Sequence, residues 1–187
     1  MSANTPLRVI PKVGACIDCG ACNVACKDEW DLSDNNDRIA VVTHNEGTGG
    51  GRFSAGETSV PMSCYHCAEA PCKEVCPTDA IYRDEHGLVQ VEKDDCIGCS
   101  YCAWACPFGA TQFPDEIEST GNAGTMDKCT GCVERIEEDE NPVCFDQCAT
   151  DALAYGTPSE IAQELRGDRS ADMFRGDLGD VVFGGSL

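Results

Sequence analysis

The chain has 187 residues, of which 42% are hydrophobic and only 6% aromatic, so it offers little material for a large apolar core. Its 33 acidic residues against 13 basic ones give a formal net charge of −20, which argues against a nucleic-acid-binding role. No stretch approaches the roughly 18 apolar residues of a membrane span. Residues 1–16 show no apolar signal segment and no twin arginine, so we expect no export signal of its own.

Acidic residues are spread along the whole chain, and only five of the 13 basic residues are lysine. This composition favours a surface adapted to high salt, and therefore a halophilic source. The alternative is an acidic surface that steers basic partners toward the protein. Either way, a fold with so little apolar material should depend on covalent or metal cross-links.

Cysteine is the residue that can supply such cross-links, and it falls into four groups along the chain. They are CIDCGACNVAC, CYHCAEAPCKEVC, CIGCSYCAWAC, and CTGC followed by CFDQC. The spacing C-x2-C-x2-C-x3-C is that of bacterial two-cluster ferredoxins, in which the fourth cysteine reaches the neighbouring cluster. Small residues such as Gly20, Gly98 and Gly131 let the backbone approach the sulfur atoms. The sequence therefore predicts four iron–sulfur clusters held by Cys16, Cys19, Cys22, Cys26, Cys64, Cys67, Cys72, Cys76, Cys96, Cys99, Cys102, Cys106, Cys129, Cys132, Cys144 and Cys148.

Zinc and disulfides are the competing interpretations of these groups. CTGC and CYHC resemble halves of a structural zinc site, but zinc sites usually pair two such knuckles. Three closely spaced cysteines with a fourth three residues later fit a tetrahedral ion poorly. A disulfide framework would suit a secreted protein, for which we see no signal. The pattern favours iron–sulfur clusters.

The segments between the cysteine groups predict few regular elements. Residues 43–58 are polar and Gly-rich and predict a surface loop. Residues 81–91 predict a hairpin with DEHG at its turn, and 158–167 a capped helix that ends at Gly167. The tail, 172–187, either docks on a partner or frays.

Other side chains carry weaker signals. His66 lies between Cys64 and Cys67, where it either donates a hydrogen bond to a cluster sulfur or simply packs the loop. His44 and His86 fall in polar, turn-like segments. Trp30 and Trp104 are expected to pack beside clusters or at an interface. We find no catalytic triad, dinucleotide-binding glycine motif or carboxylate pair, so we expect a non-catalytic chain.

Taken together, the motifs resemble one known family. They are CxxCxACxxACK, CYHCxxxPCxxVCPTxA, DxCIGCxYCxxACPFGA, and KCxxC with CxxxCxTxA, and they span about residues 10–157. In this order they resemble the four-cluster electron-transfer (beta) subunits of the dimethyl sulfoxide reductase family of molybdopterin oxidoreductases. Lys27 and Ala149 stand where a ferredoxin has proline. Neither departure affects a ligand position.

The resemblance implies how the thiols are shared and how the chain folds. Every ligand position is cysteine, so it implies four [4Fe-4S] clusters and no three-iron cluster. It implies an α+β fold of two ferredoxin-like dicluster lobes with short strands, short helices and many loops. Residues 1–48 and 122–187 would form an outer lobe, and 49–121 an inserted lobe. The implied ligand sets are Cys16, Cys19, Cys22 and Cys148; Cys26, Cys129, Cys132 and Cys144; Cys64, Cys67, Cys72 and Cys106; and Cys76, Cys96, Cys99 and Cys102.

The function implied by the resemblance is electron relay. The outer lobe would face a large molybdopterin-binding catalytic subunit carrying molybdenum or tungsten. The inserted lobe would lead to a membrane quinone subunit or a soluble acceptor. A stand-alone polyferredoxin is the alternative. The expected location is a membrane-associated complex, on the cytoplasmic side or exported with a twin-arginine partner; the substrate, the direction of flow and the stoichiometry stay open.

Overall fold

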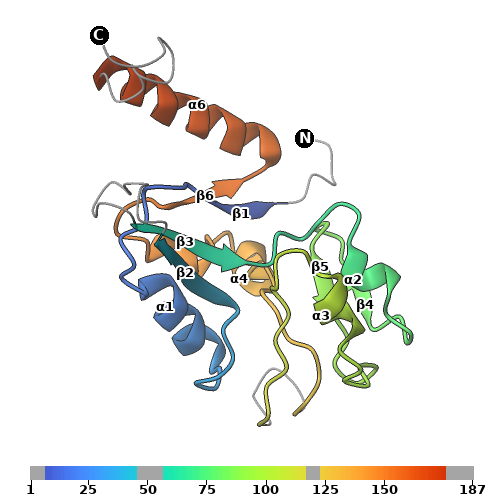
Figure 1. Cartoon of the computed structure of the whole chain (residues 1–187). Coiled ribbons are helices and arrows are strands. Elements are labelled where there is room, and N and C mark those ends of the chain that lie inside the picture. The colour runs from blue at the N-terminus through green and yellow to red at the C-terminus, as the bar shows by residue number, and fades with distance from the viewer. Residues whose placement is uncertain (1–6, 46–56, 117–122, 176–187) are drawn as a thin grey trace.

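The computed structural model describes residues 7–45, 57–116 and 123–175, and it is a mixed helix and strand structure (Figure 1). Its strands form three two-stranded antiparallel sheets, β1 with β6, β2 with β3 and β4 with β5. The predicted α+β class with short elements and many loops is confirmed at this level. The elements are β1 (Arg8–Pro11), α1 (Ala21–Trp30), β2 (Ile39–Asn45), β3 (Glu57–Ser63), α2 (Pro71–Glu74), β4 (Ile81–Arg83), β5 (Val89–Val91), α3 (Tyr101–Ala105), α4 (Val133–Glu137), α5 (Val143–Asp146), β6 (Leu153–Gly156) and α6 (Pro158–Arg175).

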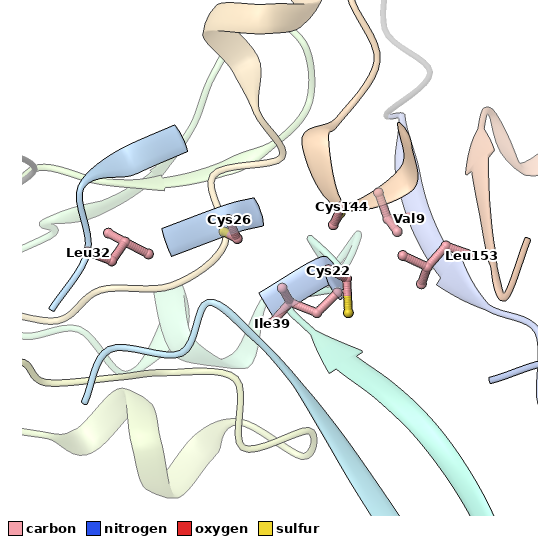
Figure 2. Packing of buried hydrophobic residues seen from close by; sticks show 7 residues of the cluster. All are labelled: Val9, Cys22, Cys26, Leu32, Ile39, Cys144 and Leu153. Carbon is pink, nitrogen blue, oxygen red and sulfur yellow. The ribbon is translucent and has the colours of Figure 1, made fainter. Parts of the chain in front are cut away.

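The two ends of the described chain meet in the β1–β6 sheet, which lies beneath α6 in Figure 1. The amide of Lys12 continues the pairing by donating to the carbonyl of Ala152 at 2.8 Å. This sheet brings the first and fourth cysteine groups together around one hydrophobic core, which we call the first core (Figure 2). Its buried members are Val9, Cys22, Cys26, Leu32, Ile39, Cys144 and Leu153.

A second core lies among α2, α3 and the β4–β5 hairpin. The predicted hairpin at 81–91 is confirmed, and its turn is closed because the Asp84 carboxylate accepts the amide of Leu88 at 2.8 Å. Leu88 and Val89 are almost completely buried. The buried members of the second core are Ala70, Ile81, Val89, Cys102 and Met126.

The β2–β3 hairpin differs from the loop predicted over 43–58. Residues 43–45 and 57–58 lie in the strands, while 46–56 lie outside the described residues. The strands pair over seven residues, from Ile39 with Ser63 to Asn45 with Glu57. Because valine and threonine are frequent in them, pleated pairing extends further than the Gly-rich composition of the segment suggests.

Helix α6 begins as predicted and extends further than predicted. The Thr157 hydroxyl accepts the amide of Glu160, and the Glu160 carboxylate accepts the amide of Thr157, which forms a capping box. The predicted end at Gly167 was wrong, because the helix continues to Arg175. Glycine inside a helix costs only about 1 kcal/mol. Lys12 offsets this by forming ion pairs on both sides of it, with Glu164 at 2.7 Å and Asp168 at 3.3 Å. The predicted tail beyond residue 175 lies outside the described residues.

The two cores are linked by one buried carboxylate, that of Asp127. Its oxygens accept bonds from Asn36 at 2.8 Å, from Arg38 at 2.7 and 3.0 Å, and from Lys93 at 2.6 Å. The side chains of Arg38 and Asp127 are each only 2% exposed. Burial raises the pKa of Asp127, but the hydrogen bond and charge of Arg38, helped by Lys93, lower it to about 2. Asp127 is therefore ionised and fully partnered.

Replacing Asp127 with asparagine should destabilise the fold by roughly 3–5 kcal/mol, because it leaves the buried Arg38 charge without a counter-charge. Urea unfolding of the anaerobically purified protein, followed by circular dichroism, measures the change. Glu164→Gln is the matched control, since it removes a partly exposed carboxylate whose ion pair contributes at most about 1 kcal/mol. Equal unfolding midpoints for the two variants would contradict a central role for Asp127.

Salt should also stabilise this protein. Among the side chains that the structure describes, Asp127 is the only buried carboxylate, so the repulsion of the −20 net charge acts mainly at the surface. We expect the thermal unfolding midpoint to rise with KCl. Simple screening is nearly complete at about 1 M, where the Debye length is about 3 Å. A continued rise above 1 M would support the halophilic interpretation, and a plateau below it would contradict that interpretation.

Candidate metal centres

All sixteen predicted cysteines are free thiols, and the structure gathers them around the two cores. In the first core, the Cys22 thiol interacts electrostatically with those of Cys16, Cys148 and Cys19. Cys148 comes from 122 residues beyond Cys26, so this contact depends on the β1–β6 pairing. The Cys26 thiol lies one helical turn further along α1 and interacts instead with the thiols of Cys129 and Cys132 from the fourth group. The Cys144 thiol of the fourth group interacts with those of Cys129, Cys132, Cys26 and Cys22.

The second core gathers thiols in the same manner. The Cys72 thiol interacts with those of Cys64 and Cys106, from the second and third groups. Cys67 packs against the same core. A small cavity beside this core is lined by Cys76, Cys96, Cys99 and Cys102, among others.

Each cysteine group begins with the same backbone turn. The second residue after the first cysteine has a positive φ in all four groups, at Asp18 (59°), His66 (45°), Gly98 (68°) and Gly131 (75°). The turn aims the amide of this residue at the preceding sulfur. The amide of His66 donates to Cys64 Sγ at 3.4 Å, and that of Gly131 to Cys129 Sγ at 3.3 Å. Such amide donors stabilise the negative charge of thiolates that bind a cluster.

A second turn follows the last cysteine of three groups and explains the repeated PTDA, PFGA and ATDA segments. The third residue after that cysteine has a positive φ, at Asp79, Gly109 and Asp151. The next amide then points back at the sulfur, as Ala152 does to Cys148 Sγ at 3.1 Å. Asp, Asn and Gly adopt this conformation at least cost. The first group lacks the turn because Cys26 continues within α1, where Lys27 replaces the ferredoxin proline.

Burial leaves several of these thiols poor acids unless a cation binds them, although hydrogen bonds from the Thr78 amide and hydroxyl and from the Ile81 and Ala80 amides lower the pKa of Cys76. Burial raises the pKa of Cys22 and of Cys102 to about 11, and that of Cys129 to about 12. Burial also raises the pKa of Cys26 and Cys144, and the neighbouring thiols raise it further. Iron ions supply the positive charge that stabilises clustered thiolates. Sulfur donors, converging amides and small loop residues together fit an iron–sulfur cluster.

His66 is buried at the contact between the two cores. Its Nδ1 accepts the amide of Val89 at 3.0 Å, while its buried Nε2 has no partner among the described residues. Burial, followed by the positive charge of Lys128, lowers the pKa of His66 well below its usual value. A buried polar atom without a protein partner also fits a centre that binds another group.

Three buried charged residues, Arg38, Asp127 and Lys128, were not predicted from the sequence. Only the position of Lys128 immediately before Cys129 offered a signal. Trp30 packs against the first core as expected, with the Arg38 guanidinium 6.0 Å from its ring centre. Trp104 is 91% exposed, so of its two expected positions, beside a cluster or at an interface, the exposure favours the interface. His44 is exposed, and His86 lies 3.3 Å from Glu137 at the surface.

Comparison with known proteins places these features in a family. The 4Fe-4S dicluster domain matches residues 57–158. The formate dehydrogenase iron-sulfur subunit of Wolinella succinogenes is 42% identical over 168 residues, which cover 81% of each protein. The thiosulfate reductase electron transfer subunit of Salmonella typhi is 40% identical, over 78% of this chain and 72% of that protein. A subunit of the anaerobic dimethyl sulfoxide reductase of Escherichia coli is 34% identical, over 83% of this chain and 75% of that protein.

Matches of this extent establish family membership, and together with the sixteen cysteines they support four [4Fe-4S] clusters. When bound, such clusters accept and release single electrons. The chain therefore belongs to the 4Fe-4S dicluster-domain family and, within it, to the iron–sulfur electron-transfer subunits of the molybdopterin oxidoreductases.

Proposed function

We propose that this chain relays single electrons between a molybdopterin catalytic subunit and a membrane quinone subunit or soluble acceptor. The carrying observation is that thiols gather in both cores and at the contact between them, from Cys16 at one end to Cys99 at the other. The chain itself is a non-catalytic subunit, since its chemistry-bearing residues are thiols for clusters. A stand-alone polyferredoxin is not favoured, because the relatives named above are subunits of enzymes.

The proposed ligand sets follow the thiol contacts within each core. One set is Cys16, Cys19, Cys22 and Cys148, and its neighbour is Cys26, Cys129, Cys132 and Cys144, both at the first core. Cys64, Cys67, Cys72 and Cys106 form a third set, and Cys76, Cys96, Cys99 and Cys102 a fourth, both at the second core. The electrostatic interaction between the Cys129 and Cys64 thiols supports electron passage between the second and third sets.

Two ferredoxin-like lobes remain part of the proposal. The first core would belong to an outer lobe and the second core to an inserted lobe ending near residue 121. The first boundary was predicted between residues 48 and 49, but β3 pairs with β2 across it. This pairing favours an inserted lobe that starts after Ser63, at the second cysteine group.

Exposed apolar side chains at both ends of the thiol series support docking to partners. On α3, Trp104 and Tyr101 are 91% and 61% exposed, beside the exposed Cys99. On α1, Val24 is 66% exposed, near the exposed Cys19. We propose that the catalytic subunit covers the α1 end and the electron acceptor the α3 end.

The membrane association of the complex also remains a proposal. Within the described residues, no helix has the length and apolarity needed to span a bilayer. We place a quinone-reactive membrane subunit at the α3 end. The complex would lie on the cytoplasmic side, or it would be exported if the catalytic partner carries a twin-arginine signal.

Anaerobic purification of the tagged chain from its native host, in high salt, tests the function. We expect about sixteen iron atoms per chain, from four clusters of four, together with near-stoichiometric molybdenum or tungsten from the co-purified catalytic subunit. Metal analysis and mass spectrometry of the eluate make the measurement. Iron without molybdenum or tungsten would favour the polyferredoxin, and zinc in a colourless protein would refute iron–sulfur binding.

Replacing Cys148 with alanine tests the ligand sets. If Cys148 serves the cluster of the first group, the electron paramagnetic resonance spectrum of Cys148→Ala should match that of Cys19→Ala, with the same cluster signal lost or altered. Cys129→Ala is the matched control and should change a different signal. A Cys148→Ala spectrum that resembles the Cys129→Ala spectrum would overturn the assignment.

A further inference from the structure

Two segments meet where the cores join, and we call this junction the central contact. It consists of Leu88, Val89 and Gln90 of the hairpin packed on residues 128–131 of the fourth cysteine group. Gln90 donates to the Thr130 carbonyl at 2.9 Å, and Lys128 donates to the Val89 carbonyl. A Cβ atom on Gly131 would lie 2.8 Å from Leu88 Cδ1, so a larger residue would require the buried Leu88 side chain to shift, and the φ of 75° at Gly131 also disfavours one.

The His66 ring fills the rest of the central contact. It projects from the second cysteine group, and its Nε2 lies 3.5 Å from where a Cβ atom on Gly131 would be. Gly131 is the residue whose amide donates to Cys129 Sγ. The imidazole therefore stands between the loop of Cys64 and Cys67 and the loop of Cys129 and Cys132.

Hydrogen bonding fixes which ring nitrogen carries the proton. Nδ1 accepts the Val89 amide at 3.0 Å, so it carries no proton, and the proton of the neutral ring is on Nε2. This Nε2–H group has no acceptor among the described residues, although His66 is only 3% exposed. Leaving a buried donor unsatisfied is unfavourable, because the group loses its hydrogen bonds to water without replacement, so an acceptor is to be expected there.

Lys128 provides an independent indication of an anionic group at the same place. Its side chain is buried, with 3% exposure, and it donates to the Val89 and Cys129 carbonyls. No carboxylate forms an ion pair with it in the part of the chain that the structure describes. A buried cation needs a counter-charge, and its charge acts on the thiols of Cys72 and Cys129, one on each side of the contact.

We propose that His66 Nε2–H donates a hydrogen bond to a sulfur atom of one of the two clusters that flank the central contact. This inference rests on the proposed function and assigns one residue a role in it. A donor to cluster sulfur stabilises the reduced, more negative state and raises the reduction potential. His66 thereby tunes the step at which electrons cross between the cores.

Substitutions that mimic each half of the imidazole test the proposal. Asparagine at position 66 keeps an acceptor near Nδ1 and tolerates the φ of 45°, but lacks the Nε2 donor. Glutamine places an amide donor near Nε2. In redox titrations of anaerobically purified holoprotein, His66→Asn should lower the midpoint potential of one cluster by about 59 mV. This shift corresponds to a tenfold change in the one-electron reduction equilibrium of that cluster. His66→Gln should recover most of that shift, and His86→Asn is the surface control.

A spectroscopic measurement on the unaltered protein remains informative even where a variant fails to fold. With ¹⁵N-histidine label, pulsed electron paramagnetic resonance of the reduced holoprotein should detect a weakly coupled histidine nitrogen. The coupling should persist in His86→Asn and disappear in His66→Asn.

The outcomes separate this inference from the proposed function. No histidine coupling in a protein with full iron would overturn the inference alone, as would equal potentials in His66→Asn, His66→Gln and unaltered protein. A purified protein without iron would overturn the proposed function and the inference with it.

Discussion

The buried carboxylate of Asp127 is the interaction on which the arrangement of the two cores depends. It collects Asn36 and Arg38 from the end of the first cysteine segment and Lys93 from just before the third. Each oxygen accepts two bonds, so the ionised group is compensated without water. Because Asp127 leads directly into Lys128 and Cys129, the same residue sets where the fourth group meets the β4–β5 hairpin. The position of Asp127 therefore sets how the two cores meet.

Charge is distributed in opposite ways inside and outside this protein. Among the described residues, Asp127 is the only buried carboxylate, while the interior also holds Arg38 and Lys128 close to the thiols. A [4Fe-4S] cluster with four thiolate ligands is anionic, so buried cations and amide dipoles are what its surroundings must supply. Arg38 is already partnered by Asp127, whereas Lys128 donates to two carbonyls and has no carboxylate partner among the described residues. Acidic surface and cationic interior therefore serve different tasks.

This fold relies on repeated turns around the cysteines, whereas larger proteins rely on a large apolar core. Positive φ values recur at matching places in the cysteine groups. At the first turn the residue's own amide donates to sulfur, as at His66 and Gly131, and at the second turn the next amide does, as at Ala152. The two cores each contain few residues, several of them cysteines. A chain of this kind gains much of its folding free energy from metal–thiolate bonds. This explains why 6% aromatic content is sufficient.

The sequence by itself determined the local chemistry. Cysteine spacing, glycine and aspartate at the turn positions, the DEHG hairpin and the capping box before α6 all depend on residues close together in the chain, and all were predictable. Only the tertiary structure decided what depends on distant segments: that Asp127 joins both cores, and that His66 is buried with Nδ1 occupied and Nε2 without a partner among the described residues. Likewise α6 passes through Gly167 because Lys12, far away in sequence, pairs with acids on both sides of it. Local spacing fixes which groups can bind, whereas pairing of remote strands and one buried ion pair fix where those groups meet.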